Sequence, residues 1–187
     1  MATDIVLFKE KGLDFGYEKT ITAKLVKLRD AKAKTSELLI VEARDIDEAR
    51  KAAENKNVDV MVGVESSGRR DKMQFRNSGL NQVICKLCKA NNTAIAIPIA
   101  EIINSPKRNA LLGRVMQNIK FCRKYKVRMV AASFAKNTLE QRTSKDVESF
   151  LKTLGMTPAE SVAAMNNVEI ILKEKKETVR KGVKIKS

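Results

Sequence analysis

The chain has 187 residues, of which 43% are hydrophobic and 32% charged, a balance typical of a folded domain and not of a disordered or fibrous chain. Lys and Arg number 37 against 22 Asp and Glu, so the formal net charge is +15, which favours nucleic acid as a partner over an anionic membrane surface. No apolar run approaches the roughly 20 residues that span a bilayer, and the chain starts without the pattern of a secretory signal. We therefore expect a cytoplasmic protein that does not bind membranes.

Strands and helices alternate along the first half of the chain. In order, the patterns predict a strand at Ile5–Phe8, a weak strand at Lys19–Thr22, a helix from Leu25 to about Lys34, a strand at Leu38–Val41, a helix with the capping-box residues Asp45 and Glu48, and a strand at Val58–Val62. The loop that follows has Gly63 and Gly68 at P-loop spacing, but Arg69 and Arg70 stand where Lys and Ser or Thr are required. This loop therefore predicts guanidinium contacts to a phosphate and no nucleotide-binding P-loop.

The second half continues the alternation. The patterns predict a helix capped by Ser78 with the apolar stripe Leu80, Val83, Ile84, Leu87 and Cys88, a strand at Thr93–Ile97, a helix opened by Ser105 and Pro106, a strand at Val127–Ala132, a helix from Ser144 to Gly155, a short helix with the capping box Thr157–Glu160, and a last strand at Val168–Leu172. The run Thr93–Ile97 is apolar without alternation, which is typical of parallel sheets covered on both faces.

The helix after Ser105 is strongly basic. Between Ser105 and Arg128 there are eight basic residues and no acidic one. The apolar stripe of this helix comprises Leu111, Leu112, Val115, Met116, Ile119 and Cys122, and the side chains expected to project away from it are Lys107, Arg114, Lys120 and Lys124. Lys107 and Arg108 lie at the helix start, where the dipole disfavours positive charge. This placement favours phosphate binding over a merely solvated surface.

The alternation of strands and helices predicts an α/β fold with a parallel sheet. Periodicity alone does not choose between a doubly wound sheet and a (β/α) barrel, and an eight-fold barrel takes about 250 residues, so a barrel here would be incomplete. We expect one domain over residues 1–172 and a basic C-terminal tail over residues 173–187.

Several catalytic chemistries are excluded by composition. The chain has no histidine, so Ser-His and Cys-His nucleophile pairs and histidine metal ligands are absent. We also find no pair of carboxylates placed for general acid–base catalysis. Cys85 and Cys88 form a C-x-x-C pair with only Cys122 besides, too few ligands for structural zinc, so we expect buried free thiols. With no Trp, two Tyr and six Phe, we do not expect sequence-specific reading of unpaired bases by stacking, which leaves shape and phosphate recognition of a structured RNA or a duplex.

A family resemblance rests on a series of short segments in fixed order. They are Val58-Asp59-Val60, Gly68-Arg69-Arg70-Asp71, Ser78-Gly79-Leu80-Asn81-Gln82-Val83, Arg108-Asn109-Ala110-Leu111-Leu112, Arg123-Lys124-Tyr125-Lys126-Val127, Ser133-Phe134-Ala135, and Arg142 with Asp146-Val147. With these segments the chain resembles archaeal ribonuclease P protein component 3, counterpart of the eukaryotic 30 kDa subunit. Gln82 departs from the family, in which histidine is frequent at this position.

The resemblance implies a TIM-barrel-like α/β fold related to the histidinol-phosphatase-type phosphoesterases. It implies a subunit of the ribonucleoprotein that removes the 5′ leader of precursor tRNA, in which the RNA, with Mg²⁺, is the catalyst and this chain binds no cofactor. It also implies contact with ribonuclease P RNA, with protein component 2 and with other protein subunits of the particle, and with precursor tRNA indirectly.

We accordingly expect neither a catalytic nor a metal-binding residue in this chain, and an RNA-binding face formed by Arg69, Arg70, Arg76, Lys107, Arg108, Arg114, Lys120, Arg123, Lys124, Lys126, Arg128 and Arg142. Two alternatives stay open. One is a (β/α)-barrel enzyme for a small phosphorylated substrate, for which the candidate groups are Glu42, Glu65, Glu101 and Ser133. The other is a general RNA-binding or ribosomal protein.

Overall fold

Parallel strands form the centre of the fold. The computed structural model describes residues 2–9, 14–31, 37–66, 68 and 70–182. Within them, a five-stranded parallel sheet has the order β3-β4-β5-β6-β7, and β1 pairs with β2 in a second parallel sheet. The strand bounds are Thr3–Val6 (β1), Lys19–Thr22 (β2), Leu25–Lys27 (β3), Ile40–Glu42 (β4), Val60–Val62 (β5), Ala94–Pro98 (β6) and Met129–Ala132 (β7).

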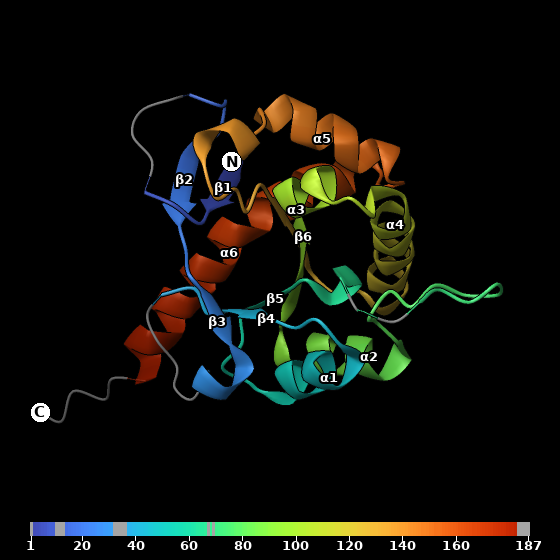
Figure 1. The fold of residues 1–187 in the computed structure, drawn as a ribbon. Helices are drawn as coiled ribbons and strands as arrows, with labels where there is room; N and C mark the ends of the chain where they lie inside the picture. Colours follow the sequence, from blue (N-terminus) through green and yellow to red (C-terminus); the bar gives the residue numbers. More distant parts are fainter. Residues whose placement is uncertain (1, 10–13, 32–36, 67, 69, 183–187) are drawn as a thin grey trace, which may run out of the picture.

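The two sheets together approach a barrel. β1 lies beside β7 through a parallel bridge between Val6 and Ala135, while β2 leads after two residues into β3 at the other edge of the larger sheet. The strands therefore curve round a common centre without forming a closed barrel (Figure 1). The barrel-like α/β fold expected for the chain is confirmed in this open form.

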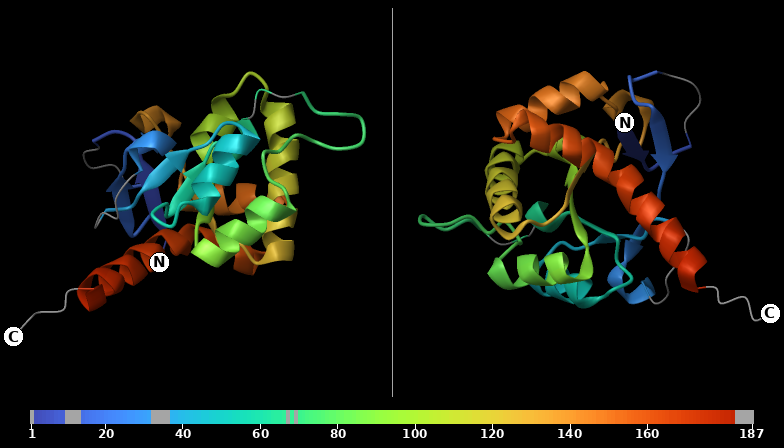
Figure 2. Two further views of the ribbon diagram at one scale, coloured as in Figure 1. Left: turned by 90° about the horizontal axis from the view of Figure 1, so that it is seen from below. Right: turned by 180° about the vertical axis from the view of Figure 1, so that it is seen from behind.

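Helices cover both faces of this sheet. Their bounds are Ile46–Glu54 (α1), Gln82–Asn91 (α2), Ile99–Asn104 (α3), Arg108–Tyr125 (α4), Ser144–Thr153 (α5) and Pro158–Gly182 (α6). Helices α1, α2 and α4 follow one another round the outside, whereas α6 runs obliquely across the back of the molecule and contacts β7 and β1 (Figure 2). None of the described helices is both long and apolar enough to cross a bilayer.

Neighbouring strand residues contribute to different apolar clusters. Val41 and Met61 belong to the outer cluster with the helices α1, α2 and α4, whereas Ile40 and Val60 belong to an inner cluster. The inner cluster is completed by Val168 and Ile171 of α6 and by Ile5 of β1. Burial on both faces explains why the strands are apolar without alternation.

The predicted strand at Val168–Leu172 is wrong, because these residues lie inside α6. The capping box at its start forms as predicted: the Thr157 hydroxyl accepts from the Glu160 N–H at 3.2 Å, and the Glu160 carboxylate accepts from the Thr157 N–H at 2.8 Å. Val168 and Ile171, three residues apart, then face the sheet from one side of the helix. The helix continues past the boundary expected at residue 172, and the Lys175 ammonium donates to the Glu37 carbonyl oxygen at 2.5 Å and to the Asp59 carboxylate.

The helix predicted from Leu25 is also wrong in its first part. Residues Leu25–Lys27 form β3, which pairs with Ile40–Glu42, and the 3₁₀ turn Leu28–Asp30 follows. Pairing with a neighbouring strand outweighs the weak helical pattern of this segment. The remainder of the predicted helix, residues 32–36, lies outside the described residues.

Three predicted helix starts shift by one to three residues. Asn81, and not Ser78, caps α2 by accepting from the Ile84 N–H at 2.9 Å, and Thr143, and not Ser144, caps α5. Ser105 ends the unpredicted helix α3, and α4 begins only at Arg108. Val83 and Met116, both predicted to be buried, are 52% and 41% exposed, because the buried face of α2 runs through Ile84, Cys85 and Cys88 and that of α4 includes Arg114 and Asn118.

Candidate nucleic-acid interface

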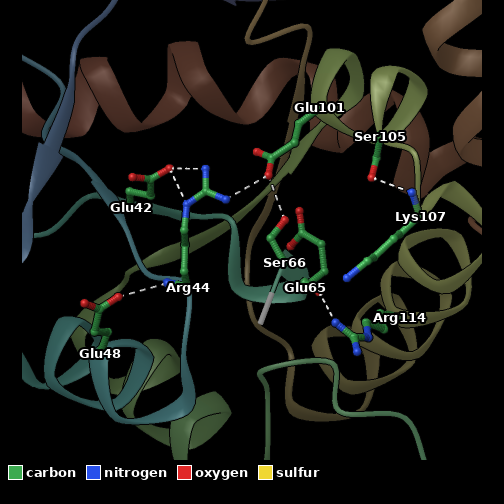
Figure 3. A network of polar contacts seen from close by, with 9 residues as sticks. All are labelled: Glu42, Arg44, Glu48, Glu65, Ser66, Glu101, Ser105, Lys107 and Arg114. Atoms are coloured by element: carbon green, nitrogen blue, oxygen red, sulfur yellow. Dashed lines mark hydrogen bonds and ion pairs between the residues drawn. The ribbon is translucent and has the colours of Figure 1, made fainter. Parts of the chain in front are cut away.

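A polar network lies where the parallel strands end. Glu42 is the last residue of β4, Ser66 follows β5, and Glu101 belongs to α3 directly after β6. Arg44 joins two of them, with its Nη2 at 2.6 Å from Glu42 Oε1 and its Nη1 at 3.5 Å from Glu101 Oε1 (Figure 3). The Ser66 hydroxyl donates to Glu101 Oε1 at 2.7 Å. The hydrogen bonds with Glu42 raise the pKa of Arg44, so this network holds its carboxylates as ion-pair partners.

Glu65 lies beneath this network and is only 1% exposed. Burial raises the pKa of its carboxyl from 4.5 to about 8, so it is mostly protonated at neutral pH. Its Oε1 and the Oδ1 of Asn118 have no hydrogen-bond partner among the described residues, and both side chains line one cavity of about 10 Å³. A group enclosed in so small and apolar a space cannot meet a substrate.

The fourth candidate of the enzyme alternative has a structural role. The Ser133 hydroxyl donates to Asp4 Oδ2 and its backbone N–H donates to Asp4 Oδ1, both at 2.7 Å, and both residues are fully buried. These bonds tie β1 to the end of β7. Burial raises the pKa of Asp4 even though the hydrogen bonds from Ser133 oppose it. Glu42, Glu65 and Glu101 do meet at one edge, whereas Ser133 is occupied by Asp4.

The cysteines are buried free thiols, as predicted. Burial raises the pKa of Cys85 to about 11 and that of Cys88 to about 12, and it also raises the pKa of Cys122. None of the three is therefore a reactive thiolate. Within the part of the chain that the structure describes, no three His, Cys, Asp or Glu residues gather as metal ligands.

A cationic cleft adjoins the polar network. It has a volume of about 680 Å³ and is lined by Arg44, Arg70, Lys107 and Arg114 together with Asp71 and Glu101. The loop after β5 supplies Arg70 and Asp71, and the start of α4 supplies Lys107. Cations therefore outnumber carboxylates in this cleft, which suits a phosphate group.

Seven of the predicted RNA-contacting cations are exposed and make no ion pair within the described residues. They are Arg70, Arg76, Lys107, Arg108, Lys120, Lys124 and Lys126. All but Arg70 and Arg76 belong to α4 or to its two ends, and the Arg76 guanidinium lies against Gly113 of α4. The structure thus brings these cations onto one helix and the loop beside it. Arg69 lies outside the described residues.

The prediction that Arg114 projects to solvent is wrong. Its side chain is buried, with Nε at 2.9 Å from Asp71 Oδ1 and Nη1 at 2.9 Å from the carbonyl oxygen of Glu65. The loop after β5 folds over this part of α4, so the guanidinium holds the loop in place.

Three further predicted cations are engaged at the surface. Arg123 forms a bidentate ion pair with Glu160, with Nε at 2.7 Å from Oε1 and Nη2 at 2.6 Å from Oε2. These bonds lower the pKa of Glu160 to about 2. Arg128 pairs with Glu174 at 2.8 Å, and the Arg142 guanidinium donates to backbone carbonyl oxygens nearby. Arg123 and Arg128 thus attach α6 to the rest of the fold, whereas the hydrogen bonds of Arg142 are local to the segment before α5.

Comparison with known families identifies the family of this chain. The sequence model described as RNase P subunit p30 matches residues 20–180. The chain belongs to this family. The ribonuclease P protein component 3 of Methanosarcina barkeri is 28% identical over 137 residues, which cover 72% of this chain and 54% of that protein. The ribonuclease P protein component 3 of Methanococcoides burtonii is 28% identical over 142 residues, which cover 75% of this chain and 56% of that protein. The chain spans about half the length of the curated relatives it matches.

Solved structures support the α/β architecture of the chain. A chain in a cryo-EM structure of archaeal ribonuclease P with mature tRNA matches with a TM-score of 0.74 and 16% identity, over 99% of this chain and 96% of that chain. A crystal structure of an amidohydrolase matches with a TM-score of 0.52 and 10% identity, over 75% of this chain and 33% of that one. At such identities the two likenesses establish the architecture alone.

Sequence reasoning missed several cations of this p30-family chain. Lys72 in the loop before α2, and Lys86 and Lys89 on α2, are exposed, and Lys89 lines one pocket together with Arg123 and Lys126. A signal for them exists: between Asp71 and Glu140 the only acidic residue is Glu101. Counting acids over this whole stretch, and not over one helix, would have included them.

Proposed function

We propose that this chain is a protein subunit of ribonuclease P that supports the catalytic RNA, with its Mg²⁺, in removing the 5′ leader of precursor tRNA. The observation that carries this proposal is membership of the p30 family over residues 20–180. The structure is consistent with a supporting role, because the carboxylates at the strand ends are ion-paired or enclosed. The chain itself binds no cofactor in this proposal.

The proposed RNA contact is the surface of α4 and the loop before α2. Its exposed cations lie on elements that contain no exposed acid besides Asp71, which is bonded to Arg114. A polyanion can therefore approach along the helix without meeting a like charge. Protein component 2, the partner implied by the family resemblance, would bind elsewhere on the molecule, and both proteins would act on the same RNA.

The test is reconstituted cleavage of precursor tRNA. Cognate ribonuclease P RNA and protein component 2 are combined at moderate Mg²⁺, with and without this chain. A large gain in cleavage rate only when the chain is present is the expected result. Equal rates, with the chain folded and the other components active, would overturn the proposal.

The RNA-binding surface predicts a change in salt dependence. Replacing Lys107, Arg108, Lys120 and Lys124 by Ala should lower the slope of log affinity against log salt by about 3, since each lost phosphate contact removes roughly 0.7–0.9. The measurement is binding of ribonuclease P RNA over a salt series. The matched control replaces four exposed lysines of other elements, Lys24, Lys27, Lys51 and Lys145, and changes the net charge equally. Equal slopes for both variants would show that only net charge matters.

A further inference from the structure

The loop between β5 and α2 projects from the body of the molecule. In Figures 1 and 2 the green segment before α2 extends past α4 as a narrow hairpin in every view. At its tip a tight turn forms, in which the Lys72 N–H donates to the Phe75 carbonyl oxygen at 2.9 Å. Met73 at this tip is 104% exposed and Phe75 is 51% exposed. The loop thus carries two large apolar side chains that are exposed to solvent, Met73 fully and Phe75 by about half.

Side chains of α4 fix the base of this loop. Arg114 bonds Asp71, Gln117 Nε2 donates to the Arg76 carbonyl oxygen at 3.1 Å, and Asn118 Nδ2 donates to the Ser78 carbonyl oxygen at 3.0 Å. Three side chains from one face of α4 thus hydrogen-bond to this loop and hold its base in one conformation. The tip is therefore presented on a preorganised support, which lowers the ordering cost of binding a partner there.

Phe75 is the one exposed aromatic side chain among residues 2–9, 14–31, 37–66, 68 and 70–182, a range that includes all eight aromatic residues of the chain. About half of the Phe75 ring is open to solvent and the nearby Met73 is fully exposed, so together they offer an apolar contact surface to a partner. Beside it lies a hollow of about 330 Å³, lined by apolar Leu80 and Phe121 and by the amides of Asn81 and Gln117. Such a space, with a flat ring at its edge and amide groups around it, has the features of a base-binding site.

The charge around the ring identifies the class of partner. The Lys72 ammonium lies 5.4 Å from the centre of the Phe75 ring, and Arg76 follows next in the chain. From residue 72 to residue 100 there is no acidic residue at all. An apolar protein anchor does not need an acid-free surround, whereas a nucleobase stacked on the ring would bring its own phosphates to these cations.

We infer that the tip of this loop binds an unpaired RNA base, which stacks on Phe75 while Lys72 and Arg76 contact the adjoining phosphates. The inference rests on the proposed function and extends it, because it adds recognition of an unpaired base to phosphate contacts along a structured RNA. It also revises the expectation from composition: the chain has few aromatics, but one of them is placed where a base can reach it.

The chain has no tryptophan, so Phe75→Trp creates a single fluorescent reporter at the tip. The probes are a 12-nucleotide oligouridylate and a blunt 12-base-pair RNA duplex. Oligouridylate should quench this tryptophan strongly and the duplex only weakly, because duplex bases are already stacked. Leu139→Trp, at a position 87% exposed outside the loop, is the matched control and should be quenched by neither. Equal quenching of both variants by oligouridylate would overturn the inference.

Affinity gives a second test. Phe75→Leu should weaken oligouridylate binding roughly 5- to 100-fold, as expected for the loss of one base–aromatic stack, with an unchanged melting temperature. Unchanged affinity would overturn the inference while leaving the proposed function intact, provided that the wild-type chain still stimulates precursor tRNA cleavage. Unchanged affinity together with a cleavage defect that excess protein component 2 corrects would instead assign the tip to a protein contact. Failure of the proposed function is recognised separately, since the wild-type chain would then give no stimulation.

Discussion

Replacing Gly79 by alanine is expected to lower the free energy of unfolding by about 3–5 kcal/mol, because the new methyl group meets backbone and the dihedral becomes strained. Gly79 has φ +79°, and a Cβ there would lie 1.9 Å from the carbonyl oxygen of Val64 and 2.7 Å from its carbonyl carbon. These are backbone atoms of the turn after β5 and cannot rotate away as a side chain can. The measurement is urea unfolding followed by circular dichroism.

Gly155→Ala separates the two causes of this loss. Gly155 also has a positive φ, +96°, but no atom lies within 4 Å of its would-be Cβ. Its substitution should therefore cost only the conformational part, about 1 kcal/mol. Equal losses for the two variants would contradict the close approach of Gly79 to Val64. A clearly larger loss for Gly79→Ala than for Gly155→Ala would show that the end of the projecting loop is held against the backbone of Val64.

Stability should fall as pH rises from about 5 to about 9, and Glu65 should be a main cause. Its pKa is raised from 4.5 to about 8 in the folded protein, so the unfolded chain releases this proton first. The stabilising effect is complete below the unfolded pKa and is lost as pH approaches and passes the folded pKa. The shift corresponds to a loss of roughly 3–5 kcal/mol for a fully enclosed carboxyl.

Glu65→Gln isolates this effect, because the amide cannot ionise and has nearly the same shape. We expect the variant and the wild type to have similar free energies of unfolding near pH 5, with the variant increasingly the more stable toward pH 9. Asp4, whose pKa is also raised, remains in both proteins, so the difference between the two curves reports Glu65. Parallel curves over this range would contradict an enclosed, protonated Glu65.

The strands of the central sheet were predictable because burial on both faces leaves runs that are apolar throughout, as in Ile95 and Met61 with their neighbours. The capping box at Thr157 was predictable because both its hydrogen bonds are local in sequence. The strand Leu25–Lys27 was not, since it depends on pairing with β4, more than ten residues away along the chain. Val168 to Leu172 likewise suits a strand or a buried helix, and only the preceding cap distinguishes them.

The cationic surface was predictable in composition but not in detail. Periodicity placed Arg114 opposite the apolar stripe, yet the loop carrying Asp71 covers it and turns it into a structural residue. Arg123 is likewise engaged by Glu160, which lies at the start of α6. The exposure of Phe75 had no local signal either, because it follows from how α4 holds the loop. Each of these outcomes depends on contacts between elements distant in sequence.

The position of α6 also has a consequence for the order in which the protein acquires its structure during synthesis. The inner apolar cluster joins Ile5 and Ile40 to Val168 and Ile171, and Lys175 bonds Asp59, 116 residues earlier in the chain. A ribosome releases the strands before α6, so the inner face of the sheet stays uncovered until residues 158–182 have been synthesised. Such long-range closure is slow and leaves apolar strand surface open to aggregation in the meantime. The inner face of the sheet is therefore completed only after α6 has been synthesised.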